Sequence, residues 1–526
     1  MKYTMYFAGL IACFFSIVAV QAQENKFLNS PARKLQLAEF AIANLYVDEV
    51  NEGKLVEEAI VKMLEQLDPH STYSDPEEVK KMNEPLQGNF EGIGIQFNMA
   101  EDTLLVIQPV SGGPSEKAGI LAGDRIVMVE DTLIAGVKMS TEDIMRRLRG
   151  PKDSKVNLKI LRRGVKELLP FTVKRDKIPV YSLDASYMIK DKIGYIRINR
   201  FAATTHEEFK KALAELQKKG MKDLILDLQG NGGGYLNAAI DIANEFLGKK
   251  ELIVYTEGRR NPRSEFFAKG TGEFQNGRLI VLVDEFSASA SEIVTGAVQD
   301  WDRGVVVGRR SFGKGLVQRP IDLPDGSMIR LTVARYYVPS GRSIQKPYDE
   351  GKEKYYTDIY QRLLHGEFSQ KDSIHFDEKL KFQTVGGRTV YGGGGIMPDL
   401  FVPGDTVGFS RYLVEVNRKN QYLYDFTFDF MDRHRQETKN IKDYKQLLKY
   451  LDRFDLVNEM ADYAAARGLK RDEKGIRDSY DVLDSLIKAF IGRHVLDDDG
   501  FYPIFYQNDV TIKKAIEAQG TGVQAD

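Results

Sequence analysis

Four short apolar runs separated by helical segments constrain the fold of this chain more than any other feature. Each run has the length of a buried strand, and the segments between them have the apolar spacing of helices. This alternation predicts βαβ units with right-handed crossovers, and therefore an α/β core. The strands are predicted at 193–198, 224–228, 279–283 and 304–308, with helices at 204–220 and 236–247 and from 290 onwards.

Three serines, Ser287, Ser289 and Ser291, lie on the turn between the third strand and the helix that follows it. A strand-to-helix turn exposes a nucleophile, and the unpaired N–H groups at a helix start stabilise an oxyanion beside it. The residues Ser289 to Glu292 also fit a capping box, in which the serine caps the helix and the glutamate reaches back to the serine amide. These residues alone leave catalysis and capping open, and they do not choose among the three serines.

A catalytic serine needs a neighbouring base. None of the six histidines lies within sixty residues of the serine run. Lys314 follows Ser289 by 25 residues, in a turn between two glycines. If the next run is an extended strand, Lys314 and Gln318 share one face, and Gln318 is placed to orient the amine. Burial must then lower the pKa of Lys314 far below its ordinary value of about 10.4.

A glycine-rich loop at 229–234 follows the second predicted strand. Its glycines allow main-chain amides to face a ligand with no side chain in the way. Taken alone, such a loop is more often a flexible turn. Together with the serines, it is a second source of oxyanion donors.

Asp300 lies on the same helix face as Ser289, eleven residues further along the chain. That spacing corresponds to roughly 16 Å along a helix axis. Asp300 is therefore too far away to contact Ser289, and we interpret it as a structural or supporting residue.

Residues 87–176 have a different pattern, with short strands and turns in place of alternating strands and helices. A helix is predicted at 140–148. The strands are predicted at 92–97, 104–110, 124–129 and 156–161.

Several motifs resemble the carboxyl-terminal processing peptidases, also called tail-specific proteases, a serine peptidase family with an embedded PDZ domain. The motifs are SASASEI at 287–293, FGKGLVQ at 312–318, DLQGNGGG at 227–234, GIGI at 92–95 and a PDZ-like string from Ser111 to Ile126. The resemblance spans about residues 30–345, together with GIMPD at 395–399. It implies a crotonase-like α/β sandwich with an inserted PDZ domain and helical N- and C-terminal segments.

The resemblance also implies roles for individual residues. Ser289 matches the nucleophile, Lys314 the general base and Gln318 the glutamine beside it. The amides of Ala290 and Gly233 match the oxyanion hole, with Gly233 chosen among the three consecutive glycines of the loop.

In the PDZ domain of this family, the loop before an edge strand binds the terminal carboxylate of a peptide that adds to the sheet. The resemblance places that loop at Gly92, Ile93, Gly94 and Ile95, with the helix 140–148 beside the groove. The implied substrates are proteins or peptides with apolar C-termini. The alternative is a spacer domain without a ligand.

The composition excludes several other classes. With 42% hydrophobic and 29% charged residues, the chain is neither fibrous nor disordered. The net charge of -2 gives no strong field for a nucleic-acid partner. The sequence has no Walker pattern and no metal-spaced cluster of Cys and His, so neither a metal nor a cofactor is predicted.

Residues 1–22 have the plan of a secretory signal peptide, with a basic start, an apolar stretch and a small-residue cleavage site ending at Ala22. This predicts a periplasmic or otherwise exported protein whose mature chain begins near Gln23. One alternative is lipidation at Cys13. Another is an uncleaved segment that associates with a membrane, although 16 apolar residues are short for a full span.

The rest of the chain is predicted to form four segments. A polar connector is expected at 68–86. The insertion 346–390 is expected to cover the site or contact a partner, and the C-terminal helices to pack on the core or join subunits of a homo-oligomer. The segments are an N-terminal helical segment at 23–86, the PDZ domain at 87–176, the peptidase core at 177–404 and a helical region at 405–526.

Two other classes of protein share parts of this pattern. A crotonase-like acyl-CoA enzyme also has a glycine-rich oxyanion loop, but it needs neither an export signal nor a serine–lysine pair. A catalytically silent PDZ scaffold keeps the groove and can lose Ser289 or Lys314. Because both residues are present, the sequence favours an exported serine endopeptidase that cleaves proteins near their C-terminus.

Overall fold

The computed structural model describes residues 30–521, apart from 101, 376, 406–407 and 418–420. The signal peptide predicted at 1–22 lies outside the described residues. The chain forms two compact units, of which the smaller comprises Met1–Pro76 and Gln318–Thr332. The larger comprises Glu77–Val317 and Val333–Asp526.

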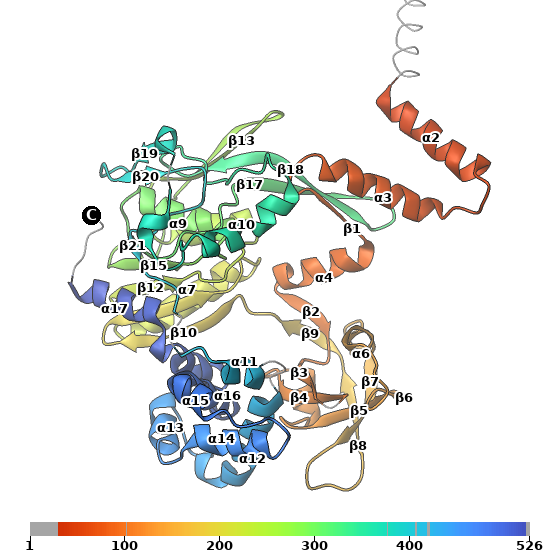
Figure 1. The fold of residues 1–526 in the computed structure, drawn as a ribbon, viewed down its shortest axis with the longest axis vertical. Coiled ribbons are helices and arrows are strands. Elements are labelled where there is room, and N and C mark those ends of the chain that lie inside the picture. Colours follow the sequence, from red (N-terminus) through yellow and green to blue (C-terminus); the bar gives the residue numbers. More distant parts are fainter. Residues whose placement is uncertain (1–29, 101, 376, 406–407, 418–420, 522–526) are drawn as a thin grey trace, which may run out of the picture. The chain divides into compact units, whose positions relative to one another are not determined.

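A six-stranded sheet forms the centre of the larger unit (Figure 1). Its first two strands are antiparallel, and the others are parallel. All four strands predicted for the core are present, with boundaries shifted by at most one residue, and the predicted α/β class is confirmed. In order across the sheet, the strands are β10 (Leu183–Lys190), β11 (Ile193–Ile198), β12 (Asp223–Asp227), β15 (Leu279–Val283), β16 (Val305–Gly308) and β21 (Leu400–Phe401).

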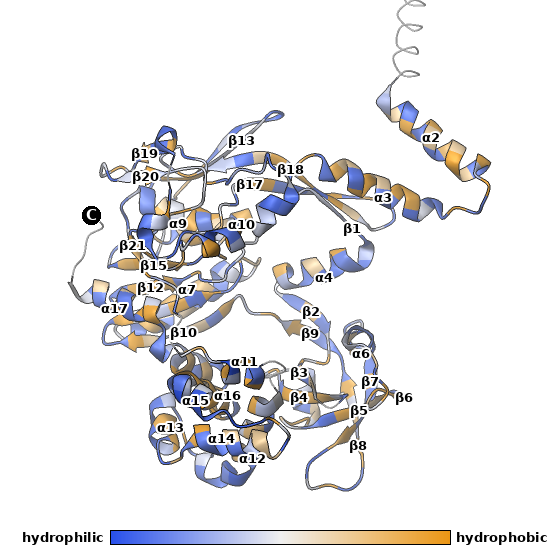
Figure 2. Ribbon diagram, in the orientation of Figure 1, coloured by the Kyte–Doolittle hydropathy of each residue, from blue (hydrophilic) through white to orange (hydrophobic). Residues whose placement is uncertain are grey.

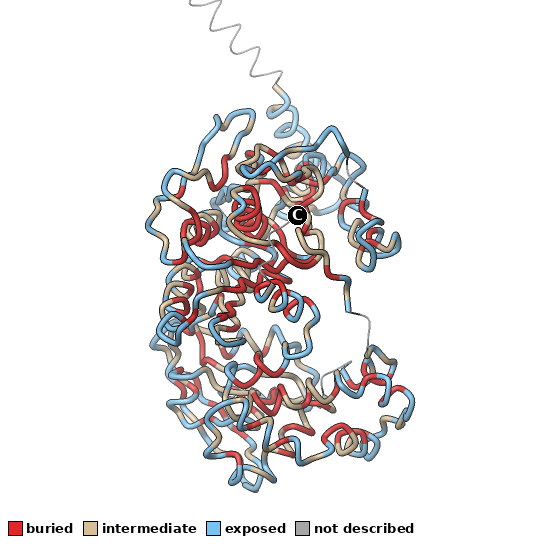
Figure 3. Tube along the Cα trace, turned by 90° about the vertical axis from the view of Figure 1, so that its left-hand side faces the viewer, coloured by how far each residue is buried: buried red, intermediate tan, exposed pale blue. Residues whose placement is uncertain are grey.

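Helices cover both faces of this sheet, because its strands are apolar on both sides. On one face, α7 (Thr205–Lys218), α8 (Leu236–Asn244) and α9 (Ala290–Asp300) pack against residues such as Leu226 and Val281. On the other face, α17 (Val510–Thr521) packs against Leu282 and its neighbours. Every residue of β15 and of α9 is buried. Figure 3 shows the buried residues of the chain in red. The turn between these two elements therefore has a rigid support on either side.

The PDZ domain is a five-stranded sheet with one additional short strand, β6 (Thr132–Leu133), and two helices, α5 (Pro114–Ala118) and α6 (Thr141–Leu148). The strand predicted at 92–97 is two strands, because the chain turns at Gly94, where φ is +71°. The first of them is β2 (Asn89–Gly92), which pairs with β9 (Asp176–Pro179). The sheet order is β3 (Ile95–Ala100), β4 (Thr103–Pro109), β5 (Arg125–Val129), β7 (Lys155–Leu161) and β8 (Leu169–Lys174).

The N-terminal helices follow their capping residues. Helix α2 (Pro31–Leu45) begins after Ser30, and the Ser30 hydroxyl accepts a hydrogen bond from the Arg33 amide at 3.2 Å. Helix α3 (Glu52–Glu65) begins after Asn51, which caps it through the Lys54 amide at 3.0 Å.

The prediction of a polar connector at 68–86 is wrong. It contains strand β1 (Thr72–Ser74) and helix α4 (Pro76–Gln87). Pro76 stands at the start of α4, where its fixed φ favours the helix, and two glutamates follow in the first turn. The polar composition of the segment obscured this helix start.

A second sheet has the strand order β1, β18 (Met328–Tyr337), β13 (Leu252–Gly258) and β14 (Asn261–Phe267), with β17 (Leu316–Asp322) also paired to β18. Within the smaller unit, β18 pairs with β1 through residues 328–330. Within the larger unit, it pairs with β13 through residues 335–337.

The insertion and the C-terminal region supply the remaining elements. The insertion contains α10 (Lys352–Leu364), two short 3-10 turns, and the pair β19 (Lys381–Gln383) and β20 (Thr389–Tyr391). In the part of the chain that is described, no helix is long and apolar enough to cross a bilayer. Six C-terminal helices share a hydrophobic core of their own: α11 (Arg411–Asn417), α12 (Gln421–Thr438), α13 (Tyr444–Leu451), α14 (Leu456–Ala465), α15 (Glu473–Asp478) and α16 (Tyr480–Phe505).

Asp300 has the structural role that its position predicted. Its carboxylate pairs with Arg342 at 2.8 Å, and both side chains are 0% exposed. The second carboxylate oxygen accepts a hydrogen bond from the Ser340 amide at 2.9 Å. This ion pair therefore joins the end of α9 to the segment after β18.

We expect Asp300→Ala to lower the free energy of unfolding by about 3–5 kcal/mol, because it leaves the Arg342 charge buried and unpaired. Urea unfolding measures the effect. The control is Arg163→Ala, which removes an exposed ion pair with Asp429 and should cost about 1 kcal/mol or less. Equal losses in the two variants would contradict a structural role for Asp300.

Candidate active site

Ser289 occupies the sharpest turn of the candidate site, between β15 and α9. Its backbone has φ +58° and ψ -112°, a combination that residues other than glycine rarely adopt. The side chains of Ser287 and Ser291 are buried, and their hydroxyls donate to main-chain carbonyls at 2.8 Å in each case. Ser289 is the partly exposed serine of the three. A strained strand-to-helix turn is the geometry that presents a nucleophilic hydroxyl.

Glu292 connects the Ser289 turn to the Lys314 turn. One carboxylate oxygen accepts hydrogen bonds from the amides of Ser289 (2.8 Å) and Lys314 (2.9 Å). The other accepts from the Gly313 amide (2.7 Å) and the Ser311 hydroxyl (2.5 Å). The bond from the Ser289 amide is the one that a capping box predicts. The others join residues about twenty positions apart, so no local sequence pattern could have indicated them.

Tyr336 makes the corresponding connection on the carbonyl side. Its hydroxyl lies within hydrogen-bond distance of the carbonyl oxygens of both Ser289 (3.1 Å) and Lys314. The Tyr336 side chain is fully buried in β18. The main chains of the two predicted catalytic residues are therefore linked through their amides and through their carbonyls. Sequence reasoning missed this tyrosine because it stands in an ordinary strand.

Burial raises the pKa of Glu292 from 4.5 to about 7, although the hydrogen bonds from Ser311, Lys314, Gly313 and Ser289 oppose that shift. All four donors point at the carboxyl oxygens. The geometry therefore favours the ionised form, while the apolar surroundings favour the neutral form. Glu292 changes its charge close to neutral pH.

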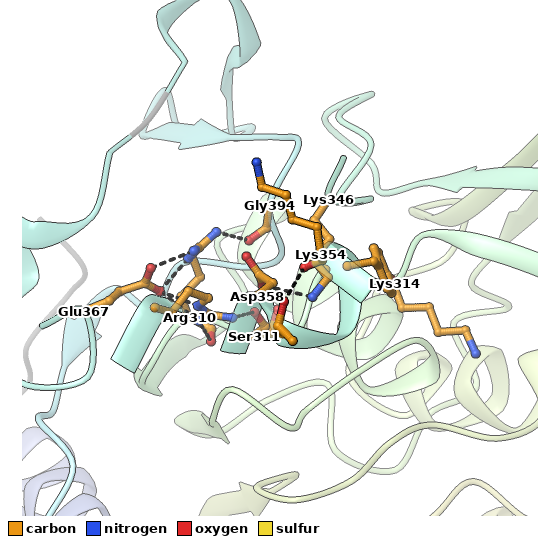
Figure 4. Close-up of polar contacts among 12 residues, drawn as sticks. Arg310, Ser311, Lys314, Lys346, Lys354, Asp358, Glu367 and Gly394 are labelled. Carbon is orange, nitrogen blue, oxygen red and sulfur yellow. Dashed lines mark hydrogen bonds and ion pairs between the residues drawn. The ribbon is translucent and has the colours of Figure 1, made fainter. Parts of the chain in front are cut away.

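The Lys314 turn depends on the two glycines that flank it. Gly313 has φ +87°, and a Cβ there would lie 3.1 Å from the Lys346 Cβ. The Gly315 amide donates to the Gln345 side chain at 2.8 Å. Lys314 itself is half-buried, and Figure 4 shows its side chain pointing away from the Arg310 and Glu367 side chains.

Gln318 belongs to the smaller unit, whereas Lys314 belongs to the larger one. The Gln318 side-chain amide donates to the Thr332 hydroxyl at 3.4 Å, and that hydroxyl donates to Asp68 at 3.0 Å. The predicted orientation of the Lys314 amine by Gln318 stays a prediction.

Gly233 lies directly against the nucleophile turn. A Cβ on Gly233, where φ is +103°, would come within 2.8 Å of the Ser289 Cβ and 3.1 Å of the Ala290 nitrogen. The structure therefore brings together the two residues predicted for the oxyanion hole. The Gly233 amide donates to the Asn231 side chain at 2.9 Å, so stabilising an oxyanion requires this amide to exchange partners.

The loop predicted to bind a peptide terminus is at the edge of the PDZ sheet. Gly92 ends β2, and Ile95 begins β3, which is an edge strand. Ile93 is 3% exposed and packs in the PDZ core, while Ile95 is half-buried. The Gly94 carbonyl accepts the Val110 amide at 3.0 Å. β3 thus presents a sheet edge, which is the kind of edge that can accept an added strand.

Four family models match the chain. They are "Peptidase family S41" over residues 192–351, "PDZ domain" over 92–174, "Activating protease CtpB N-terminal domain" over 16–78 and a family of unknown function over 412–497.

Two curated relatives give the same result. A carboxy-terminal-processing protease of Bartonella bacilliformis is 38% identical, over 62% of this chain and 76% of the relative. The carboxy-terminal processing protease CtpB of Bacillus subtilis is 36% identical, over 62% of this chain and 68% of the relative. The solved structure of a photosystem II D1 C-terminal processing protease is 31% identical, covers 61% of this chain and 85% of that chain, and has a TM-score of 0.35.

These matches define the class as a serine peptidase with an inserted PDZ domain. The chain belongs to the carboxy-terminal processing proteases of peptidase family S41. The predicted family is confirmed, and the alternative of an acyl-CoA enzyme is set aside.

We expect Glu292→Gln to lower kcat/KM by roughly 100-fold. The two carboxylate oxygens of Glu292 accept bonds from four donors, whereas a glutamine side chain has a single acceptor oxygen. The substitution should also change the pH dependence of stability. Between about pH 4.5 and 7, the folded protein keeps a proton on Glu292 that the unfolded chain has released. The free energy of unfolding therefore falls as pH rises through this window, by up to about 3 kcal/mol, and the loss is complete above it.

Urea unfolding of the parent and of Glu292→Gln at pH 5, 6, 7 and 8 isolates this contribution, since all other titrating groups are shared. The variant should lack that component of the pH dependence. Parallel stability curves for the two proteins would show that Glu292 is not the titrating group.

Proposed function

We propose that this protein is an exported serine endopeptidase that uses a Ser289–Lys314 dyad to cleave proteins near their C-terminus. The observation that carries the proposal is the double link between the two residues, through Glu292 on the amide side and Tyr336 on the carbonyl side. A link of this kind fixes the separation of the two main chains. Fixed separation of nucleophile and base is what nucleophilic catalysis requires.

The mechanism follows from the chemistry of the two side chains. The neutral Lys314 amine accepts the proton of the Ser289 hydroxyl as the oxygen attacks the scissile carbonyl. The resulting ammonium then gives that proton to the leaving amine, and an acyl-enzyme remains. Water, deprotonated by the same amine, attacks the ester and restores Ser289.

The oxyanion that forms in each step needs two donors. The Ala290 amide, at the first residue of α9, is one of them, and its position at a helix N-terminus favours negative charge. The second is an amide of the 232–234 loop, with Gly233 as our assignment because it lies against Ser289.

We propose that the PDZ domain selects substrates by their free carboxyl terminus. The loop Gly92–Ile95 offers amides to the carboxylate, and the open edge of β3 pairs with the extended tail. A tail bound in this way is unfolded over several residues, which is the form that a peptidase site accepts.

We further propose that the protein is exported by the 1–22 leader and forms homo-oligomers. The C-terminal helices, which we expected to pack on the core or join subunits, share a hydrophobic core of their own, and we assign the subunit contact to helix α2 instead. Helix α2 has no buried residue, and Leu37, Phe40 and Leu45 are all exposed. Figure 2 shows that α2 carries both hydrophobic and hydrophilic residues. Large exposed apolar surface of this kind is typical of an interface. N-terminal sequencing of the exported protein, expected to begin near Gln23, and light scattering of Phe40→Asp test the two statements.

We expect Ser289→Ala and Lys314→Ala each to lower hydrolysis by at least about 100-fold without unfolding the protein, because each removes one reacting group. Gln318→Ala should be milder. Peptide turnover and fluorophosphonate labelling of Ser289 measure the loss, and circular dichroism checks the fold. The control is Ser291→Ala, whose hydroxyl only donates to the Asn231 carbonyl. An inactive Ser291→Ala together with an active Ser289→Ala would contradict the assignment.

We expect a substrate with an apolar C-terminal residue to be cleaved with a kcat/KM about 10–100-fold higher than its amidated form, because amidation removes a charged acceptor. Replacing the last residue by Asp should have a similar effect. Deleting residues 92–165 should abolish the preference. If amidation leaves kcat/KM unchanged, recognition lies in the catalytic cleft and the PDZ domain is a spacer.

A further inference from the structure

The insertion predicted at 346–390 packs against the turn that carries Lys314. Its helix α10 contributes Arg362, whose side chain is 5% exposed. The Arg362 guanidinium donates to the main-chain carbonyls of Arg310 (2.7 Å) and Ser311 (3.1 Å). These two residues begin the segment that leads to Lys314, so a side chain of the insertion holds the main chain of the catalytic turn.

Glu367, just after α10, completes this contact with two arginines. Its carboxylate accepts two hydrogen bonds from Arg310, both at 2.7 Å, and one from Arg362 at 2.8 Å (Figure 4). Burial opposes its ionisation, yet the bonds from Arg310 and Arg362 hold the pKa of Glu367 below its ordinary value. One buried carboxylate therefore bridges two guanidinium groups and offsets part of the repulsion between them.

Lys346 contacts the next two residues of the same turn, Phe312 and Gly313. Its amide donates to the Gly313 carbonyl at 2.9 Å. Its ammonium lies 4.0 Å from the centre of the Phe312 ring and 4.3 Å from the Tyr355 ring, and it pairs with Asp358 at 2.9 Å. A cation between two aromatic faces is attracted by both of them. The insertion thus contacts the turn from Arg310 to Gly313.

The core contacts the same turn through different atoms. Glu292 binds the amides of Gly313 and Lys314 and the hydroxyl of Ser311. The turn is therefore held between a carboxylate of the core and the charged groups of the insertion. If either the core carboxylate or the charged groups of the insertion are removed, main-chain groups of this turn lose hydrogen-bond partners and can move.

We propose that the insertion is a built-in brace for the general base, with Arg362 and Glu367 as positioning residues for Lys314. This inference rests on the proposed role of Lys314 as the base, and it assigns a function to the insertion that neither the fold nor the family match supplies. A displacement of about 1 Å at a catalytic group costs roughly 100-fold in rate. A brace that prevents such a displacement acts on kcat and not on substrate binding.

The experiment compares two arginines that bind main-chain carbonyls, the buried Arg362 and the partly buried Arg303. Arg362→Met removes the guanidinium under the Lys314 turn. Arg303→Met is the matched control, because Arg303 donates to the carbonyls of Phe246 (3.0 Å), Phe274 (2.8 Å) and Gly277 (3.0 Å), which belong to other segments. Both variants are assayed in the full chain at a temperature at which circular dichroism shows them folded.

We expect Arg362→Met to lower kcat by about 10–100-fold with KM within about threefold of the parent value. The rise of its rate with pH should move to higher pH, because a displaced Lys314 amine is more exposed to water and harder to deprotonate. Arg303→Met should lower the melting temperature with kcat and the pH profile unchanged. Arg362→Lys, which keeps the charge and one donor, should restore part of kcat.

Three results would count against the brace. An unchanged kcat in Arg362→Met would overturn it, and so would equal losses of kcat in the two Met variants, which would indicate stability alone. If Arg362→Met does not fold, Arg362→Lys and Glu367→Gln decide the same question through their pH profiles, and unchanged profiles would overturn it. Activity remaining in Lys314→Ala would show instead that the proposed catalytic dyad is wrong.

Discussion

The hydrogen bonds that Glu292 accepts are the interaction on which the catalytic geometry depends. A carboxyl group without water costs several kcal/mol to ionise unless donors surround it. Here the donors come from two turns, at Ser289 and at Gly313–Lys314, so satisfying the carboxylate requires both turns to be in place. The unfavourable backbone angles of Ser289 persist because the contacts around this turn hold the main chain in that conformation. The glutamate thus couples the strain at Ser289, the proposed nucleophile, to the position of Lys314, the proposed base.

Several buried polar side chains around the site bind main-chain groups. Tyr336 and Arg362 contact carbonyl oxygens, and Ser287 donates to the carbonyl of Leu228. Main-chain groups in turns lack the regular main-chain hydrogen bonds of helices and sheets. These side chains supply hydrogen bonds in their place. The irregular segments that carry the chemistry become as rigid as the apolar elements β15 and α9 beside them.

The sequence was sufficient for the elements whose signals are local. Strand β15 and the start of α9 were predicted correctly because an apolar run and a serine turn mark them, and the cap at Ser30 marks α2. Helix α4 was missed because most of its residues are polar, and the apolar Val79, Met82 and Leu86 stand singly among them. The links from Glu292 and Arg362 to the Lys314 turn could not be predicted, because they join segments far apart in the chain and depend on tertiary packing.

Helix α17 has a consequence for how this protein is made. It covers one face of the six-stranded sheet through Ile512, Ala515 and Ala518, yet it follows the last strand of that sheet by more than a hundred residues. During translation, the ribosome therefore releases all the strands while this face is still without its cover. An uncovered apolar face cannot hold a parallel sheet in water. The cover of this face of the peptidase core is therefore complete only after synthesis has passed α17.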